Sequence, residues 1–455
     1  MSKPRARNTN TTLQSRLRWL VPGIGVKRWL LVLLLGATLL GLPIAYVLLD
    51  VYRGAGAPSA HGLFTLQYLP GLGRAALVGA IGAVLMAWAL AQIQHNLLAP
   101  FVRPGQDLAS AVSEHRRRGR GPRIVAIGGG TGLATLLSGL KAYTSNLTAI
   151  VTVADDGGSS GRLRHSLGVL PPGDFRNCIA ALADDEALTT QLFQYRFGSG
   201  QDLGGHSFGN LFITAMAEVT GSFERALLES SRVLAIRGQV LPSTLQDVTL
   251  VGELAVSGHG PGRVSRVEGE SQITLRQGAI QRVYLEPEEA PAYPGAIRAI
   301  LEAELIVLGP GSLYTSLLPN LLVRDLSQAI AASRGQKVYV CNTATQPGET
   351  EGYSVLDHVL AIERHTQAGL FPTVLANSRQ QGRLLPGLEW VAIDPPAAGL
   401  TENAPPAAGG KRRLLTVDVT DAERPWRHDP HKLAAALMGL LNQAEAERPQ
   451  PGVNT

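Results

Sequence analysis

Acidic, glycine, hydroxyl and arginine residues lie close together in the segment ADDGGSSGRLR, residues 154–164. The segment follows a β-branched apolar run, and doubly wound sheets bind ligands at the carboxyl ends of their strands. Asp155 and Asp156 suit a ribose hydroxyl or a magnesium ion, whereas arginines, hydroxyls and main-chain N–H groups suit phosphate. A surface turn also explains Asp-Asp-Gly-Gly, but it gives no reason for the serines and arginines that follow. We therefore predict a polyphosphate cradle formed by Gly157, Gly158, Ser159, Ser160, Gly161, Arg162 and Arg164.

A second glycine loop lies upstream, between the short apolar run 124–127 and a leucine-rich helix. Strand, glycine loop and helix N-terminus together bind phosphate, because free N–H groups and the helix dipole favour an anion. The loop matches neither G-x-G-x-x-G nor a Walker loop. A loop of this kind is as often a tight turn as a ligand site. The next strand, which ends at Asp155 and Asp156, favours a ligand here. Its residues are Gly128, Gly129, Gly130, Thr131 and Gly132.

Other polar loops follow apolar runs farther along the chain. The run 305–308 repeats the strand-then-loop pattern, as if two halves of one crevice faced each other. Asp174 would cap a helix or hold a metal, and capping is the commoner role. A lone histidine such as His206 is usually structural, but its flanking glycines indicate close approach of the backbone to a ligand. The further candidates are Asn177, His206, Asn210, Gly309, Pro310, Gly311, Ser312, Tyr314, Asn342, Gln346 and Arg427, and the candidate magnesium ligands are Asp155, Asp156 and Asp174.

These loops require strands that end at one edge of a sheet. The alternation of apolar runs and helical patterns predicts an α/β domain over 123–443 with a Rossmann-like, doubly wound, mostly parallel sheet. Residues 246–285 alternate apolar and polar positions, which predicts a small inserted β subdomain. The last residues, 444–455, are expected to form a disordered tail.

Two uncharged apolar stretches precede this domain, at about 29–49 and 75–94. The first is long enough to cross a bilayer, and together they predict two transmembrane helices, a hairpin within 29–99. Lysines and arginines gather in the tail 1–28 and the linker 100–122, so both termini and the main domain are expected on the cytoplasmic side of the inner membrane. The same basic residues could bind nucleic acid, but beside a membrane they are more simply a topology signal.

Composition restricts the other classes of site. The 455 residues carry a formal net charge of +5 and only two cysteines, Cys178 and Cys341. Two distant thiols give neither a zinc motif nor a disulfide framework. We expect reduced thiols on the cytoplasmic side and no nucleic-acid partner.

From Arg123 to about Leu441 the chain resembles the CofD/YvcK family. The resemblance is carried by AIGGGTGLATLLSGLK, VTVADDGGSSGRLR, LPPGDFRN, GGHSFGN, VLGPGSLYTSLLPN, TQPGET and RHDPHKLAAAL, seven blocks in order. It implies a Rossmann-like fold that binds a nucleotide-containing ligand. The CofD branch implies a magnesium-dependent transferase that moves a phospholactyl group from a guanosine-diphosphate carrier to the deazaflavin FO.

The other branch, the YvcK-like gluconeogenesis factors, implies binding of UDP-sugars such as UDP-N-acetylglucosamine and a link to gluconeogenic growth, cell shape and envelope synthesis. PPGDFRN has one acid, Asp174, where the transferase pattern has two, and this favours the second branch. We expect a nucleotide-sugar ligand and the membrane as partners, and leave open a homo-oligomer, a regulatory protein partner and magnesium. An NAD-dependent oxidoreductase is the weakest alternative, because the glycine fingerprint differs.

Overall fold

The chain divides into two compact units, Met1–His115 and Arg116–Thr455. The computed structural model describes residues 27–53, 71–98, 119–183, 187–198, 203–255, 264–276, 278–394, 400–402 and 412–446. The predicted basic tail and linker therefore lie mostly outside the described residues, as does 447–455. Residues 444–446 were expected in a disordered tail, but they belong to helix α16 (Pro430–Ala446).

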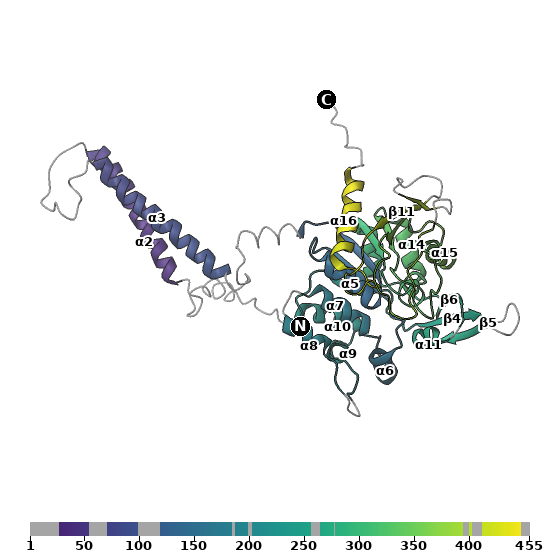
Figure 1. Cartoon of the computed structure of the whole chain (residues 1–455). Coiled ribbons are helices and arrows are strands. Elements are labelled where there is room, and N and C mark those ends of the chain that lie inside the picture. The colour runs from purple at the N-terminus through teal and green to yellow at the C-terminus, as the bar shows by residue number, and fades with distance from the viewer. Residues whose placement is uncertain are drawn as a thin grey trace, which may run out of the picture. The chain divides into compact units, whose positions relative to one another are not determined.

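The first unit is a pair of long helices, α2 (Lys27–Arg53) and α3 (Gly71–Leu98), packed along each other (Figure 1). Their backbones approach closely at Gly82, where a Cβ atom would lie 2.9 Å from the carbonyl oxygen of Gly36. Small residues at such crossings let apolar helices pack by van der Waals contact. By length and composition Ala75–Ile93 is apolar enough to cross a membrane, whereas the described apolar run of α2, Trp29–Ala45, is shorter.

The second unit contains an eight-stranded sheet in the order β10-β11-β9-β8-β7-β1-β2-β3. Every neighbouring pair is parallel, and the predicted doubly wound α/β fold is confirmed. Every residue of the central strands β7, β1 and β2 is buried, as expected where helices cover both faces. The strands are β1 (Ile124–Gly128), β2 (Leu147–Val151), β3 (Gln239–Pro242), β7 (Leu305–Leu308), β8 (Gln336–Val340), β9 (Thr373–Asn377), β10 (Leu400–Glu402) and β11 (Arg412–Val417).

The direction in which the chain adds successive strands to the sheet changes between β1 and β7. The chain runs outward from β1 through β2 to β3, and later from β7 outward through β8 and β9. Right-handed crossovers in opposite directions place the connecting helices on opposite faces, so a crevice opens at this switch point. The remaining helices are α5 (Gly130–Leu140), α6 (Gly158–Leu167), α7 (Gly173–Leu182), α8 (Ala187–Gln194), α9 (Phe208–Thr220), α10 (Phe223–Val233), α12 (Pro294–Glu302), the π-helix η3 (Leu313–Leu317), α13 (Leu318–Leu321), α14 (Arg324–Ala332) and α15 (Val355–His365).

The insertion is a separate three-stranded antiparallel sheet, as its alternating sequence predicts. Its order is β5 (Val264–Glu268), β4 (Thr249–Ala255) and β6 (Ile280–Glu286), with helix α11 (Glu270–Leu275) between β5 and β6. The backbone N–H of Val283 donates to Nε2 of His365 at the end of α15, over 3.0 Å. The insertion is thereby hydrogen-bonded to the main domain.

The glycine- and serine-rich segment after Asp156, which is predicted to form a phosphate cradle, forms helix α6 from Gly158. The helix has little apolar periodicity: it buries Ser159, Ser160 and Leu163, and the hydroxyls of both serines have hydrogen-bond partners. Tertiary packing has overridden a weak local signal.

The contact between α5 and α16 gives a test of the fold. A Cβ atom on Gly139 in α5 would lie 2.0 Å from the carbonyl oxygen of Pro430, whereas one on Gly439 in α16 would meet nothing within 4 Å. We expect Gly139→Ala to lower the free energy of unfolding by about 1–3 kcal/mol or more. Gly439→Ala should raise it by about 0.5–1 kcal/mol, because alanine favours helix. Urea unfolding of both variants measures this, and equal effects would contradict the packing of these helices.

Candidate functional site

A pocket of about 470 Å³ lies where the switch point predicts it, at the carboxyl ends of β1, β7 and β8. It combines the glycine loop after β1, the loop after β7, the polar segment after β8, helix α11 and the segment before α16. Its lining residues are Gly129, Gly130, Thr131, Gly132, Thr135, Glu270, Thr274, Pro310, Gly311, Ser312, Thr315, Ser316, Asn342, Ala344, Thr345, Gln346, Pro347, Glu349, Leu388, Trp426, Arg427 and His428.

Glycines let the two loops meet main chain to main chain. A Cβ atom on Gly132 would lie 2.4 Å from the carbonyl oxygen of Pro310, and one on Gly129 would lie 2.5 Å from Oδ2 of Asp174. Gly130 has a φ of +64°, which favours glycine. The N–H groups of Thr131 and Gly132 belong to the first turn of α5, where backbone donors have no intrahelical partner. The loop therefore offers donors to a ligand as well as a tight fit to its neighbours.

Asn342 and Gln346 hold the loop after β7 in place. Asn342 accepts from the N–H of Gly311 (3.2 Å) and donates to its carbonyl oxygen (2.9 Å). Gln346 donates through Nε2 to the hydroxyl of Ser312, over 2.9 Å. Both side chains thus orient a wall of the pocket.

Tyr314 lies behind this wall and does not line the pocket. Its ring is buried, and its hydroxyl lies 2.9 Å from that of Tyr353. Glu349 accepts from the N–H of Tyr314 (3.0 Å) and from the hydroxyl of Thr315 (2.9 Å). Burial raises the pKa of Glu349, and these hydrogen bonds partly oppose that shift. This carboxyl group organises the start of η3.

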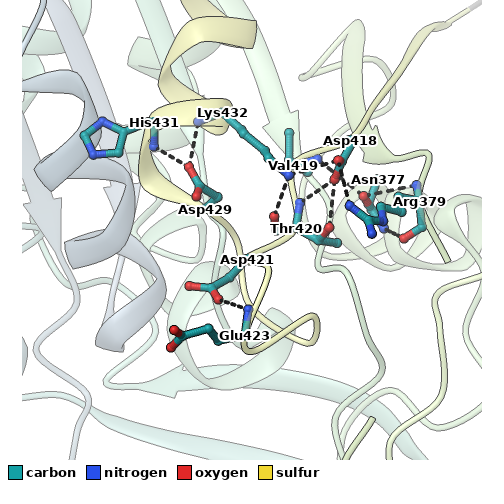
Figure 2. Close-up of polar contacts among 10 residues, drawn as sticks. All are labelled: Asn377, Arg379, Asp418, Val419, Thr420, Asp421, Glu423, Asp429, His431 and Lys432. Atoms are coloured by element: carbon teal, nitrogen blue, oxygen red, sulfur yellow. Dashed lines mark hydrogen bonds and ion pairs between the residues drawn. The ribbon is translucent and has the colours of Figure 1, made fainter. Parts of the chain in front are cut away.

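The C-terminal wall contributes Arg427, the one cationic side chain among the described lining residues. Figure 2 shows the polar network of this segment: Asp418 accepts from Thr420 and from Nζ of Lys432 (2.9 Å), and Asp429 accepts from the N–H groups of His431 and Lys432. Burial opposes ionisation of Asp418, but hydrogen bonds from Lys432 and Thr420 outweigh it and lower its pKa to about 2. The network fixes the segment that carries Arg427.

His428, the next lining residue, is buried, and its Nε2 lies 3.2 Å from the carbonyl oxygen of Cys341. Burial lowers its pKa to about 4, so the ring is neutral at physiological pH. A neutral imidazole adds no charge to the pocket.

Buried carboxyl groups lie close to the pocket: Glu270 lines it, and Asp174 lies against Gly129 of the glycine loop. Burial, and then the charge of Asp155, raise the pKa of Asp174 to about 6. Burial followed by the charges of Asp155 and Asp174 raises the pKa of Glu270 well above its ordinary value. Among the residues that the structure describes, no three histidine, cysteine or acidic side chains are placed to hold a metal ion. The candidate magnesium ligands Asp155, Asp156 and Asp174 do not form such a group, and we derive no step through a metal.

Most residues of the predicted polyphosphate cradle form helix α6, so their side chains point in different directions. Its two serines point inward: Ser160 bonds to the carboxyl of Asp155, and Ser159 contacts His206. A second, open hollow of about 690 Å³ lies beside the helix. It is lined by Asp156, Gly158, Gly161, Arg162, His165, Ser166 and His206.

Three other predicted residues make structural contacts. Asp156 accepts from the N–H of Ser271 (2.8 Å) at the start of α11. Arg164 donates to the carbonyl oxygen of Val248 (2.6 Å) and pairs with Asp247, so it ties α6 to the insertion. Asn177 accepts from Nη2 of Arg176 (2.7 Å).

Sequence reasoning did not select several lining residues. Glu270 and Thr274 lie on α11 in the insertion. The alternating apolar and polar residues of the insertion do not indicate that α11 reaches the pocket. Trp426, which directly precedes Arg427, also lines the pocket. The position of a tryptophan next to a candidate phosphate-binding arginine is the sequence feature that could have identified Trp426.

Fold and site together define a Rossmann-like α/β protein with a polar pocket at its topological switch point. The chain belongs to the CofD family: the family model described as 2-phospho-L-lactate transferase CofD matches residues 124–395. The gluconeogenesis factor of Bacillus subtilis is 46% identical over 326 residues, which cover 71% of this chain and 100% of that protein.

Other relatives extend the comparison to both units. A Nostoc sp. protein is 47% identical over 441 residues, covering 94% of this chain and 93% of its own length, so the match includes most of the first unit. A crystal structure of a Bacillus halodurans protein is 40% identical with a TM-score of 0.64, and it covers 70% of this chain and 100% of that one. A second structure from that organism is described as a UPF0052 family member.

The raised pKa of Asp174 predicts a pH dependence of stability. The folded state binds this proton more tightly than the unfolded chain, because the folded pKa of about 6 exceeds the ordinary value of 3.8. Stability contributed by the protonated form is therefore lost as pH rises from about 4 to 6. Asp174→Asn should remove this loss, so the variant should gain about 1–3 kcal/mol over the wild type across that window. Denaturant unfolding at several pH values measures the difference, and a pH-independent difference would contradict the buried acid.

Proposed function

We propose that the protein is a regulatory protein of the YvcK type, anchored in the membrane with its main domain in the cytoplasm, that binds nucleotide sugars. The ligand class is UDP-sugars such as UDP-N-acetylglucosamine, and the role is a link to gluconeogenic growth, cell shape and envelope synthesis. The observation that carries the proposal is the switch-point pocket, where the N-terminus of α5 faces Ser312 and Arg427.

The lining chemistry supports this ligand class. First-turn N–H groups of α5 and the guanidinium of Arg427 suit a diphosphate. Hydroxyl and amide side chains such as Ser316, Thr345 and Gln346 suit the hydroxyls of a sugar. The volume of about 470 Å³ lies within the range of small-molecule sites. Relatives named gluconeogenesis factors in Bacillus subtilis and Listeria monocytogenes support the regulatory role.

The second candidate is a magnesium-dependent transferase that moves a phospholactyl group from a guanosine-diphosphate carrier to FO. The printed description of the matching family model favours it. It would require Asp155, Asp156 or Asp174 to hold a magnesium ion that stabilises charge on the transferred phosphate, whereas these acids form no metal-binding group among the described residues. Phosphorus NMR with the activated lactate carrier, FO and magnesium distinguishes the two: turnover supports the transferase, and its absence leaves binding alone.

Binding of UDP-N-acetylglucosamine tests the leading proposal. Residues 116–455 can be used, because the crystallised Bacillus halodurans relative is covered completely by 70% of this chain and is thus about as long as the second unit. We expect calorimetric binding by the wild type and about 10–100-fold weaker binding by Arg427→Ala, which loses a charge-assisted hydrogen bond. Arg424→Ala is the matched control, since Arg424 lies in the same segment outside the pocket. Absence of binding by the wild type would refute the proposal.

The membrane anchor has its own test. We expect the full chain to stay in the membrane pellet after carbonate extraction, because Ala75–Ile93 is apolar and mostly exposed within the unit. Residues 116–455 alone should be found in the soluble fraction. A fluorescent protein fused to the C-terminus should fold and fluoresce if that end is cytoplasmic. Release of the full chain by carbonate, or a dark fusion, would argue against the anchor or its orientation.

A further inference from the structure

We propose that the hollow beside α6 is a second anion site that binds a phosphoryl group and is separate from the switch-point pocket. The two cavities share no lining residue among the part of the chain described. They lie on different structural parts: the pocket uses loops after β1, β7 and β8, whereas the hollow uses α6 and the glycine loop before α9. This inference does not depend on which ligand occupies the pocket.

Arg162 lines this hollow, and Arg196 lies close enough to act on His206, which also lines it. Arg162 donates to the carbonyl oxygen of Gly204 (2.9 Å), and Arg196 donates to that of Gly205 (2.6 Å). Both guanidinium groups are thus held at the glycine loop before α9, and both charges act on His206. Among described residues neither arginine forms an ion pair, and the one carboxylate that lines the hollow, Asp156, accepts from the N–H of Ser271. A bound anion would supply the negative charge that these arginines lack among the described residues.

A third arginine adds to the positive charge. Nη2 of Arg176 donates to Asn177, but its Nε is buried without a hydrogen-bond partner. Burial, and then the charge of Arg196, lower the pKa of Arg176. Arg176 and Arg196 are thus near enough to repel each other. Arg162 lines the hollow, whereas Arg196 and Arg176 lie outside its lining, and the charge of Asp174 partly offsets that of Arg176. The positive charge beside the hollow is suited to phosphate.

His206 supplies an oriented donor. Its side chain is only 8% exposed, and Nδ1 lies 3.0 Å from the hydroxyl of Ser159. Ser159 also accepts from Nδ2 of Asn210 (3.0 Å). In the tautomer in which the Ser159 hydroxyl donates to Nδ1, the neutral imidazole carries its proton on Nε2 and can donate to a ligand in the hollow that His206 lines. Burial, then the charges of Arg162 and Arg196, lower the pKa of His206 and keep the ring neutral.

The N-terminus of α6 completes the site. Gly158, which lines the hollow, is exposed with a φ of +49°, so the first-turn N–H groups of this ten-residue helix start at its edge. Guanidinium, imidazole and helix N–H donors on one concave surface match the several oxygens of a phosphoryl group. The hollow is open, so a phosphorylated small molecule can enter without displacing main chain.

Calorimetric titration of inorganic phosphate into the full chain in detergent, at constant ionic strength, tests the site. We expect Arg162→Ala and Arg196→Ala each to weaken phosphate binding about tenfold or more. Arg225→Ala, which changes an exposed arginine on α10, should leave it within about twofold. Arg162→Ala and Arg196→Ala each lose a hydrogen bond to a carbonyl oxygen, so their unfolding midpoints are measured with and without phosphate. A rise in midpoint with phosphate that occurs in the wild type and is absent from both variants distinguishes ligand binding from a structural role.

The same variants distinguish a separate site from an extension of the nucleotide site. UDP-N-acetylglucosamine affinity unchanged in Arg162→Ala supports two sites, whereas loss of both ligands in that variant overturns their separation. Phosphate binding that is absent from the wild type, or that disappears only in Arg427→Ala, also overturns the proposal. If phosphate binds through Arg162 but no UDP-sugar binds, the second site stands and the proposed function of the pocket fails.

Discussion

The site depends on one steric constraint: the backbones after β1 and β7 must touch. Parallel pairing places these strands side by side at the switch point, and only a residue without Cβ fits opposite the carbonyl oxygen of Pro310 at Gly132. Buried Asn320 reinforces the contact by donating to the carbonyl oxygens of Gly128 (3.0 Å) and Ser316 (2.8 Å). A side chain at Gly132 would separate the loops and fill the space that forms the pocket.

The placement of charge follows from that contact. Close loops bury the polar groups behind them, and buried carboxyl groups must be hydrogen-bonded or protonated. Glu349 is satisfied by Tyr314 and Thr315, whereas Asp174 and Glu270 hold their protons more tightly than free acids do. Below a pH of about 6, protonation of Asp174 removes the repulsion that its carboxylate would exert on an anionic ligand.

Much of this arrangement is predictable from sequence, because the strand-then-loop pattern and the rule that ligands bind at carboxyl ends locate the pocket. The glycine loops at Gly128–Gly132 and Gly309–Ser312 were paired correctly for this reason. The sequence did not predict that the serines of α6 are buried inside the domain. These serines looked like phosphate ligands, and nothing in their spacing indicated that Ser159 would turn inward to His206, 47 residues away. Such contacts depend on tertiary packing, which local patterns do not encode.

The insertion joins the two cavities. Helix α11 supplies Glu270 and Thr274 to the pocket, and its first turn is fixed by Asp156, which lines the hollow beside α6. The fit is tight, since a Cβ atom on Gly269 would lie 2.0 Å from Oδ2 of Asp156. Neither Asp156 nor α11 can shift far without disturbing the other. The acid that sequence alone assigned to a ribose or a metal therefore serves in the structure as the connection between both candidate sites.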